Sequence, residues 1–334
     1  MSRNIWALLS SDFSHGSTSI FAPAGTPAHS IFSLSMLVLG ITTAIFLIVA
    51  GLLLFAVIRY RHQAGDANAA QEPPQIYGST QIELSWTVIP ILIVVLLFLA
   101  TARIILSTQN APKPAAALDV TVVGHQFWWE YSYPKLGIVT ANELHIPVSD
   151  PKHPTPVYLT MTSTDTDHSF WVPRLAGKMD LIPNQINTMW LDPQAPGLYL
   201  GQCAQYCGIQ HAKMLLRVYA DSPADFAAWI ARQQKPAVES SDTQAAAGRA
   251  IFQQSVCISC HTVTGTVATG RIGPDLTHLA SRDTIASGSL PNTPANLRAF
   301  IDNPAAFKPG VLMPAMHLNQ HDLDAVTAYL STLK

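Results

Sequence analysis

The four cysteines of this 334-residue chain fall in two short clusters, each of which also contains a histidine. The first cluster has the pattern C-x₃-C-x₃-H-x₂-M, with Cys203, Cys207, His211 and Met214 as its conspicuous side chains. Soft sulfur and nitrogen ligands of this kind favour copper over magnesium or calcium. Zinc sites usually take four Cys or His ligands, so the methionine would have no role in one. The cluster therefore predicts a copper site.

Two thiolates can bridge two copper ions if each ion also has one histidine and one weak ligand. A second histidine is then needed, and His168 supplies one from a segment that we expect to be a loop between strands. A disulfide between Cys203 and Cys207 is the alternative interpretation of the pair. His168 alone is equally typical of an ordinary buried histidine. Four soft ligands at these spacings favour a binuclear copper centre.

The second cluster, Cys257-Ile258-Ser259-Cys260-His261, has the C-x-x-C-H pattern of covalent c-type haem attachment. In such sites the two thiols bind the vinyl groups of the haem and the histidine binds the iron. A Cys-x-x-Cys pair alone would also fit zinc or redox chemistry. The histidine directly after the second cysteine favours haem.

The composition is that of a membrane component. Charged residues make up 12% of the chain, about half the roughly 25% of a soluble domain, and hydrophobic residues make up 49%. A net charge of −2 without a basic block argues against a nucleic-acid partner. The length allows two or three domains.

Two uncharged runs predict transmembrane helices over about 31–58 and 84–106. The first run alone spans about 42 Å at 1.5 Å per residue, more than the roughly 30 Å of a hydrocarbon core. Haem attachment belongs outside the cytoplasm, so the C-terminal part is expected on the exterior. Two spans then place residues 1–30 on the exterior as well.

A Pro- and Ala-rich connector follows the helices, and residues 111–221 then form a predicted all-β domain. Short segments rich in Val, Tyr, Trp and Leu alternate there with Pro, Gly and Asp turns, as in a β-sandwich or barrel. The predicted strands are Leu118–Val123, Phe127–Tyr133, Val157–Thr162, Thr188–Leu191, Leu198–Gln202 and Leu215–Tyr219.

A linker is predicted over residues 222–243, with a short amphipathic stretch at 224–233 and a flexible Pro- and Ser-containing part at 234–242. Residues 244–334 follow as an α-helical domain. Its closing helix, His321–Leu333, carries apolar side chains at helical core spacing.

The chain up to about residue 219 resembles subunit II of the haem–copper cytochrome c oxidases. The resemblance rests on the copper loop, on Asp165-x-x-His168-Ser-Phe, on the aromatic run 124–131 and on Glu83-x-x-Trp-Thr-x-x-Pro, which opens the second span. It implies a cupredoxin-like Greek-key fold. The implied copper ligands are His168, Cys203, Gln205 through its backbone carbonyl, Cys207, His211 and Met214.

Two positions depart from that family pattern. The family usually has Glu where this chain has Gln205, and that carboxylate helps to bind a magnesium ion at the interface with subunit I. The family also tends to have Trp where this chain has Phe127, as the aromatic that receives electrons. Trp128 and Trp129 are then the candidates for an electron path, with simple packing of a strand as the alternative.

The C-terminal residues resemble a class I cytochrome c domain. The resemblance implies that the Gly273–Leu276 loop holds His261 through a carbonyl, and that a methionine is the sixth ligand of the iron. Met313 is our choice, with Met316 and His317 as alternatives, since a His/Met pair gives the higher potential of an electron carrier. Arg282 is a candidate partner of a haem propionate, or else an ordinary surface arginine.

Together these parts resemble a caa₃-type oxidase, whose subunit II carries a fused cytochrome c. The implied function is transfer of electrons from an external donor, such as a cytochrome, through haem c and the copper pair to subunit I. That partner, with haem a and copper, would reduce oxygen to water and pump protons, and subunit III would accompany it. The implied location is a bacterial cytoplasmic membrane, crossed more than once, with both metal domains on the periplasmic side.

Two points stay open at this stage. Glu83 ends a Thr80–Glu83 capping box, and by resemblance it also marks the entrance of a proton channel. The chain could alternatively deliver electrons to a different terminal reductase or act as a membrane-anchored copper-binding assembly protein. A carrier must release its metal, whereas bridging thiolates favour retention and a haem would serve no purpose in it.

Overall fold

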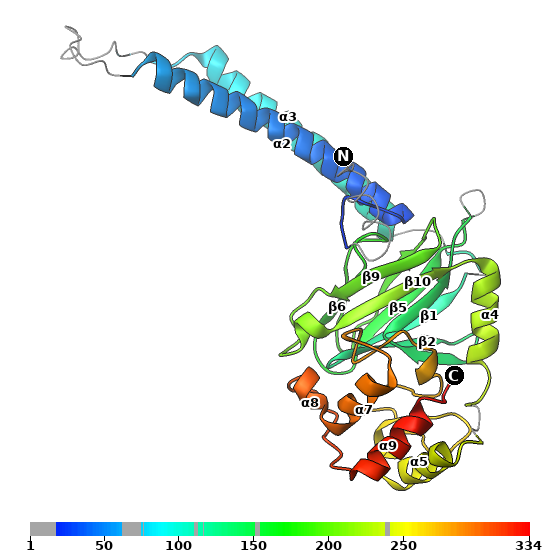
Figure 1. Ribbon diagram of the computed structural model, residues 1–334. Helices are drawn as coiled ribbons and strands as arrows, with labels where there is room; N and C mark the ends of the chain where they lie inside the picture. The colour runs from blue at the N-terminus through cyan, green and yellow to red at the C-terminus, as the bar shows by residue number, and fades with distance from the viewer. Residues whose placement is uncertain are drawn as a thin grey trace, which may run out of the picture. The chain divides into compact units, whose positions relative to one another are not determined.

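The computed structural model shown in Figure 1 describes residues 18–61, 75, 77–109, 113–115, 117–150, 154–237 and 241–334. These residues form two compact units, one of residues 30–110 and the other of residues up to His29 together with Ala111–Lys334. Parts of the predicted N-terminal segment, interhelical loop, connector and linker lie outside the described residues.

Two long helices, α2 (Thr26–Arg59) and α3 (Thr80–Gln109), correspond to the predicted spans. Both are long and apolar enough to cross a membrane, and Figure 1 shows each as an unbroken helix. They begin and end beyond the apolar runs, because flanking polar residues continue the helical hydrogen bonding. Their Leu, Ile, Val and Phe side chains are exposed on all sides, which is the pattern of a helix that needs lipid or partner helices around it.

Helix α3 begins one residue earlier than the predicted capping box requires, because the box would place Thr80 just before the helix. The amide of Glu83 donates to the carbonyl of Ser79, over 2.9 Å, so Ser79 precedes the helix and Thr80 is its first residue. The Glu83 carboxylate instead lies next to Gly78, where an added Cβ would collide with it.

A β-sandwich of two five-stranded sheets follows, which confirms the predicted cupredoxin-like domain. Strands β1, β5 and β10 alternate buried and half-buried residues, so each sheet turns one face to a common core. One sheet has the order β3-β2-β1-β5-β8, formed by Ile138–Ala141, Trp128–Tyr133, Asp119–His125, Val157–Ser163 and Asn187–Leu191. The other has the order β4-β10-β9-β6-β7, formed by Glu143–Pro147, Leu215–Asp221, Gly197–Cys203, His168–Trp171 and Met179–Leu181.

All six predicted strands are present, within three residues at each end, and four others were missed. The missed strands β3, β4, β6 and β7 are three to five residues long. Their sequences mix polar and apolar residues too briefly to show alternation. One correction concerns the site directly: His168 is the first residue of β6, not part of a loop.

The segment before α2 packs on the sandwich. The amide of Ala24 donates to the carbonyl of Arg174 over 2.7 Å, and Gly25 forms a bridge with Pro193. A Cβ added at Gly25 would lie 2.6 Å from the carbonyl oxygen of Leu175, so glycine permits this close approach. The described part of the N-terminal segment therefore belongs structurally to the sandwich.

The amphipathic stretch that opens the predicted linker forms a helix that packs on the sandwich. Helix α4 (Pro223–Gln233) begins at the N-cap Ser222 and buries Phe226 and Trp229 in the core of the sandwich. After it, the backbone carbonyls of Gln233 and Lys235 contact the ring of His278 at 3.1 and 3.0 Å. The amphipathic stretch is thus part of the copper domain, because two large aromatic side chains find a place in its core.

The C-terminal domain has its own hydrophobic core and five helices in the described residues, as expected for a cytochrome c domain. Helices α5 and α9 pack against each other (Figure 1), and Gly248 lies directly on the backbone of Ala325, so that any side chain there would collide. A two-stranded hairpin interrupts the otherwise helical domain. The elements are α5 (Thr243–Gln254), α6 (Cys257–Cys260), β11 (Thr284–Ile285), β12 (Leu290–Pro291), α7 (Pro294–Asp302), α8 (Pro304–Phe307) and α9 (Gln320–Leu330).

Candidate metal centres

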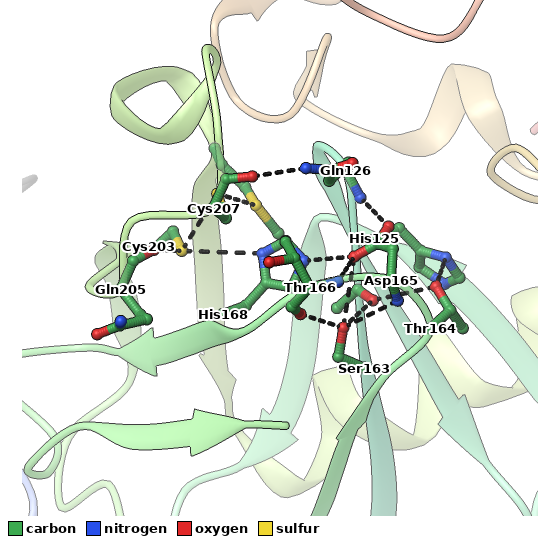
Figure 2. Close-up of polar contacts among 12 residues, drawn as sticks. His125, Gln126, Ser163, Thr164, Asp165, Thr166, His168, Cys203, Gln205 and Cys207 are labelled. Carbon is green, nitrogen blue, oxygen red and sulfur yellow. Dashed lines mark hydrogen bonds and ion pairs between the residues drawn. The ribbon is translucent and has the colours of Figure 1, made fainter. Parts of the chain in front are cut away.

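The first candidate site brings five soft ligand groups together, of which Figure 2 labels Cys203, Cys207 and His168. Cys203 ends β9, and the loop that returns to β10 carries the other three residues of its motif. The Cys203 Sγ lies 3.9 Å from the Cys207 Sγ and 4.0 Å from the Nδ1 of His168. The Cys207 Sγ lies 3.8 Å from the Nδ1 of His211 and 3.9 Å from the Sδ of Met214.

These separations suit shared metal ions better than a disulfide. A disulfide requires about 2.05 Å between the sulfur atoms, roughly half the distance observed, and both thiols are free. His168, Cys203 and Cys207 offer ligand atoms that all lie within 4.8 Å of one another, and all three side chains are buried. The donor set therefore fits a pair of copper ions.

The loop geometry is fixed by backbone hydrogen bonds. The amide of Cys203 donates to the carbonyl of Met214 over 3.0 Å, which closes the loop at its base. The carbonyl of Gln205 lies 3.1 Å from the Cys203 Sγ, while the Gln205 side chain points away from the thiols in Figure 2. Gln205 therefore reaches the site through its backbone alone.

Asp165 orients His168. Its Oδ1 lies 2.9 Å from Nε2 of the buried imidazole, which leaves Nδ1 directed at Cys203. The other carboxylate oxygen accepts from the amide of Gln126 over 2.6 Å. The Gln126 side chain in turn donates to the carbonyl of Cys207 over 2.7 Å. Outer hydrogen bonds of this kind set the tautomer and orientation of a metal-binding histidine.

Electrostatics in the metal-free pocket act in opposite directions on the two thiols. The hydrogen bond from Cys207 is the largest cause that lowers the pKa of Cys203, and burial opposes it. Burial acts to lower the pKa of His168, but hydrogen bonds with Asp165 and Cys203 outweigh it and raise that pKa. Burial likewise acts to raise the pKa of Asp165, and the His168 contact outweighs it, so that pKa is lowered. The hydrogen bond with Cys203 and burial raise the pKa of Cys207. Metal binding would therefore have to displace the proton of Cys207 and keep His168 neutral, since metal ligands must be deprotonated.

We expect Asp165→Ala to weaken copper binding by about 10- to 100-fold, the usual cost of losing an outer-shell partner. The histidine would lose the group that holds its ring toward Cys203. Titration of the purified protein with a copper chelator measures the affinity. Asp167→Ala removes an exposed carboxylate two residues away and serves as the matched control. Equal affinities in the two variants would contradict the orienting role.

Three consecutive aromatic residues lie beside this pocket. Trp129 is buried and meets the ring of His168 edge to face, with centroids 6.0 Å apart. Trp128 points to the other face of β2 and stacks on His125 at 4.1 Å. Phe127 packs against Gly208 of the copper loop, where an added Cβ would lie 3.0 Å from the ring. Phe127, which stands where the family tends to have Trp, therefore contacts the copper loop itself.

The second candidate site is a cavity of about 490 Å³ in the C-terminal domain. The Nδ1 of His261 lies 2.7 Å from the carbonyl of Pro274, as the resemblance implied, so Nε2 is left for a metal. His317 is exposed and outside the lining, whereas both candidate methionines belong to it. The motif residues and methionines in the lining are Cys257, Cys260, His261, Met313 and Met316.

The polar groups of the cavity fit a haem. Arg282 lines it and donates to the carbonyl of Asp275 over 2.5 Å, while its Nε is buried without a hydrogen-bond partner in the described part of the chain. An unpaired guanidinium N–H matches a propionate carboxylate. The remaining lining is largely apolar, as a porphyrin ring requires. Of the other predicted site residues, Glu83 lies in the first turn of α3, in the other unit of the chain.

Comparisons with known proteins agree with this division into three parts. Residues 15–104 match the family profile for the cytochrome c oxidase subunit II transmembrane domain. Residues 151–220 match its periplasmic domain, and residues 245–334 match the cytochrome c family. The cytochrome c oxidase subunit 2 of Alkalihalophilus pseudofirmus is 34% identical over 93% of this chain and 90% of that protein.

The chain belongs to the cytochrome c oxidase subunit 2 family. The same name is carried by a Bacillus sp. PS3 protein that is 34% identical over 95% of this chain and 91% of that protein. Among solved structures, the periplasmic domain of subunit II of cytochrome oxidase from Bradyrhizobium japonicum is 26% identical over 37% of this chain and 97% of that chain, with a TM-score of 0.34.

Several sequence predictions are thereby confirmed. The chain is a subunit II with a fused cytochrome c domain, and it is a subunit of an oxidoreductase, the terminal oxidase. Subunit II is a membrane protein with extracellular domains, and its membership implies haem c, copper and further oxidase subunits. A separate copper-binding assembly protein and the input subunit of another reductase are both set aside.

Proposed function

We propose that this subunit II passes electrons from an external donor, such as a cytochrome, through a covalently bound haem c and a binuclear copper centre to subunit I. Oxygen would be reduced there to water, with proton pumping. The location would be a bacterial cytoplasmic membrane, with both metal domains on the periplasmic side and subunit III as a further partner. The proposal rests on the geometry of the first candidate site. Two thiols, two imidazoles and a thioether converge there, and each ligand atom lies no more than 4.0 Å from the next.

The proposed copper ligands have two roles: two thiols would be shared by the ions, and the other groups would complete the coordination of each ion. Cys203 and Cys207, whose sulfur atoms lie 3.9 Å apart, would hold the two ions between them. A copper pair of this kind accepts and releases one electron at a time. The remaining proposed ligands are His168, His211, Met214 and the backbone carbonyl of Gln205. Of the neighbouring aromatic residues, Phe127 and Trp128 line the cavity of the second site, and Trp129 contacts the ring of His168.

Metal and haem analysis of the purified oxidase tests the proposal. We expect two copper ions and one covalent haem per subunit II, with a mixed-valence copper signal in the EPR spectrum. Zinc at the thiols, a cystine or a single copper ion would contradict it. The family pattern predicts a magnesium ion at the interface with subunit I. We leave this ion out of the proposal, because Gln205 has no carboxylate to offer to such a hard cation.

The axial methionine of the haem is proposed to be Met313. We expect Met313→Leu to remove the sulfur–iron absorption of the oxidised haem and to lower its midpoint potential, because a thioether ligand raises the potential. Met316→Leu is the matched control, from the same cavity lining. Optical spectra and redox titration of the two variants decide the assignment, and loss of the band in Met316→Leu alone would transfer it to Met316.

Glu83 is proposed as the entrance of a proton channel into subunit I. We expect Glu83→Gln to slow oxygen consumption by the assembled oxidase, while both metal centres of subunit II are still reduced at the normal rate. Gln keeps the size of the side chain and removes its proton exchange. Gln81→Ala, in the same first turn of α3, controls for disturbance of the helix start. Unchanged steady-state turnover would remove the channel role.

A further inference from the structure

The haem domain is fixed to the copper domain by a buried carboxylate. Glu143, the first residue of β4, is only 3% exposed. Its Oε1 accepts from the amide and the hydroxyl of Thr284, each over 2.8 Å, and its Oε2 accepts from the amide of Asp283 over 3.1 Å. A carboxylate with three donors is well satisfied in a buried position. One side chain of the sandwich therefore holds the β11 strand of the haem domain.

Next to it, β11–β12 lies against the start of β10. The amide of Leu215 donates to the carbonyl of Ser287 over 3.2 Å. The hydroxyl of Ser287 donates to Oδ1 of Asn142 over 3.2 Å. Gly288 has a φ of +79°, and a Cβ there would lie 3.0 Å from the Cβ of Leu215. The turn of the hairpin is thus shaped to approach the copper domain closely.

The second region of contact is the segment after α8. Lys308 donates from Nζ to the backbone carbonyl of Phe127 over 2.8 Å. Gln210 of the copper loop donates from its side chain to the carbonyl of Pro309 over 2.6 Å. Gly310, with a φ of +81°, lies so close to Ile209 that a Cβ would be 2.6 Å from its methyl group. This segment therefore meets the copper loop and the aromatic run at once.

Lys308 is unusual because it is 2% exposed, whereas lysines are almost never fully buried without a partner. Among the described residues no carboxylate lies within ion-pair distance of it. Burial lowers its pKa to about 7, against the opposing influence of Cys207. Its hydrogen bond to the carbonyl of Phe127 crosses between the domains and offsets part of the cost of removing the side chain from water.

The two contacts lie at the cavity itself. Thr284 and Lys308 of the haem domain both line it, and so do Phe127 and Trp128 of the copper domain. The two domains therefore build this wall of the haem site together. Movement of one domain against the other would change the distance between the haem site and the copper loop.

We propose that Lys308 and Glu143 are positioning residues that hold the haem cavity against Phe127 and Trp128, so that the two metal sites form one rigid electron-transfer unit. This inference rests on the proposed function. Each transfer moves one electron, from the haem iron, which is oxidised, to the copper pair, which is reduced, and it needs no other reactant. Rapid diffusion of a tethered domain plays no part in it.

The test compares Lys308→Met, Glu143→Gln and Lys178→Met in the purified oxidase. Lys178 is an exposed lysine of the copper domain and gives the matched control. A photosensitiser reduces haem c in a flash, and copper reduction is followed by absorbance at several solvent viscosities. Midpoint potentials of both centres are measured in each variant, so that a change in driving force is accounted for.

In the unaltered protein and in Lys178→Met we expect transfer that does not depend on viscosity. In Lys308→Met and Glu143→Gln we expect transfer to be several-fold slower, because the rate of electron transfer falls with the distance between the centres, and we expect it to depend on viscosity. Hydrogen exchange at the amides of Leu215, Asp283 and Thr284 should become at least about tenfold faster, because these amides donate across the interface.

Unchanged, viscosity-independent transfer in Glu143→Gln, with its amides still protected, would overturn the inference even if Lys308→Met failed to assemble. Lys178→Met with the same loss as Lys308→Met would also overturn it. A wild-type protein that lacks covalent haem or the paired-copper signal would contradict the proposed function itself. The spectra of the unaltered protein therefore separate the two failures.

Discussion

Cys207→Ser is expected to remove the mixed-valence copper signal and to lower oxygen consumption by more than about 100-fold, beyond the 10- to 100-fold cost of an outer-shell change. The Cys207 Sγ lies 3.9 Å from the Cys203 Sγ, 3.9 Å from the Met214 Sδ and 3.8 Å from the His211 Nδ1. Because it is central to the site, no other described side chain can replace it as a bridge. Serine preserves the shape of the loop but offers a hard oxygen in place of a soft thiolate.

Copper content and EPR spectra of the purified oxidase measure the loss. Tyr206→Phe is the control, because this neighbouring side chain is 74% exposed and lies in the same loop. Haem c should remain in both variants. A copper pair that survived in Cys207→Ser with its signal unchanged would mean that the bridging assignment is wrong.

The double variant Cys257→Ala, Cys260→Ala is expected to lose covalent haem while it retains both copper ions. The two domains have separate hydrophobic cores, so we expect the copper domain to stay folded when the haem is lost. Oxygen consumption with an external cytochrome as donor should fall by more than about 100-fold, because the path to copper would lack its first centre. Without haem, a cavity of about 490 Å³ would also stay empty of the group that it fits, and this should destabilise the C-terminal domain.

A haem stain after denaturing electrophoresis, copper analysis and thermal unfolding give the three readouts. Ser259→Ala alters an exposed residue within the same motif and controls for damage to α6. Loss of copper together with haem would show that the domains depend on each other for folding, against this expectation.

The candidate metal-binding residues were predictable because their chemistry is encoded locally. The cysteine loop and the Cys-x-x-Cys-His motif each lie within one short segment, and the structure brings the residues of each together. His168 comes from a distant strand, and the need of a copper pair for a second histidine and its likeness to a family segment linked it to the loop. The role of Asp165 had one available signal, its spacing of three residues from His168.

The contacts between domains had no such signal. Lys308 stands in a Lys-Pro-Gly segment that is typical of an exposed turn, yet it is buried by residues about 180 positions earlier. The packing of α4 on the sandwich had no local signal either, because Phe226 and Trp229 find their partners in strands far away in the sequence. Burial decided by remote residues overrides local composition in both cases.

Strand β2 imposes a constraint on how this family can vary in length. Successive side chains of a strand point to opposite faces, so Trp128 lines the haem cavity while Trp129 faces His168. Inserting or deleting a single residue just before this pair would exchange their faces and turn the wrong indole toward each centre. Natural length variation should therefore gather in the turns on either side, and chains with one residue more or fewer in β2 should be absent among functional homologues.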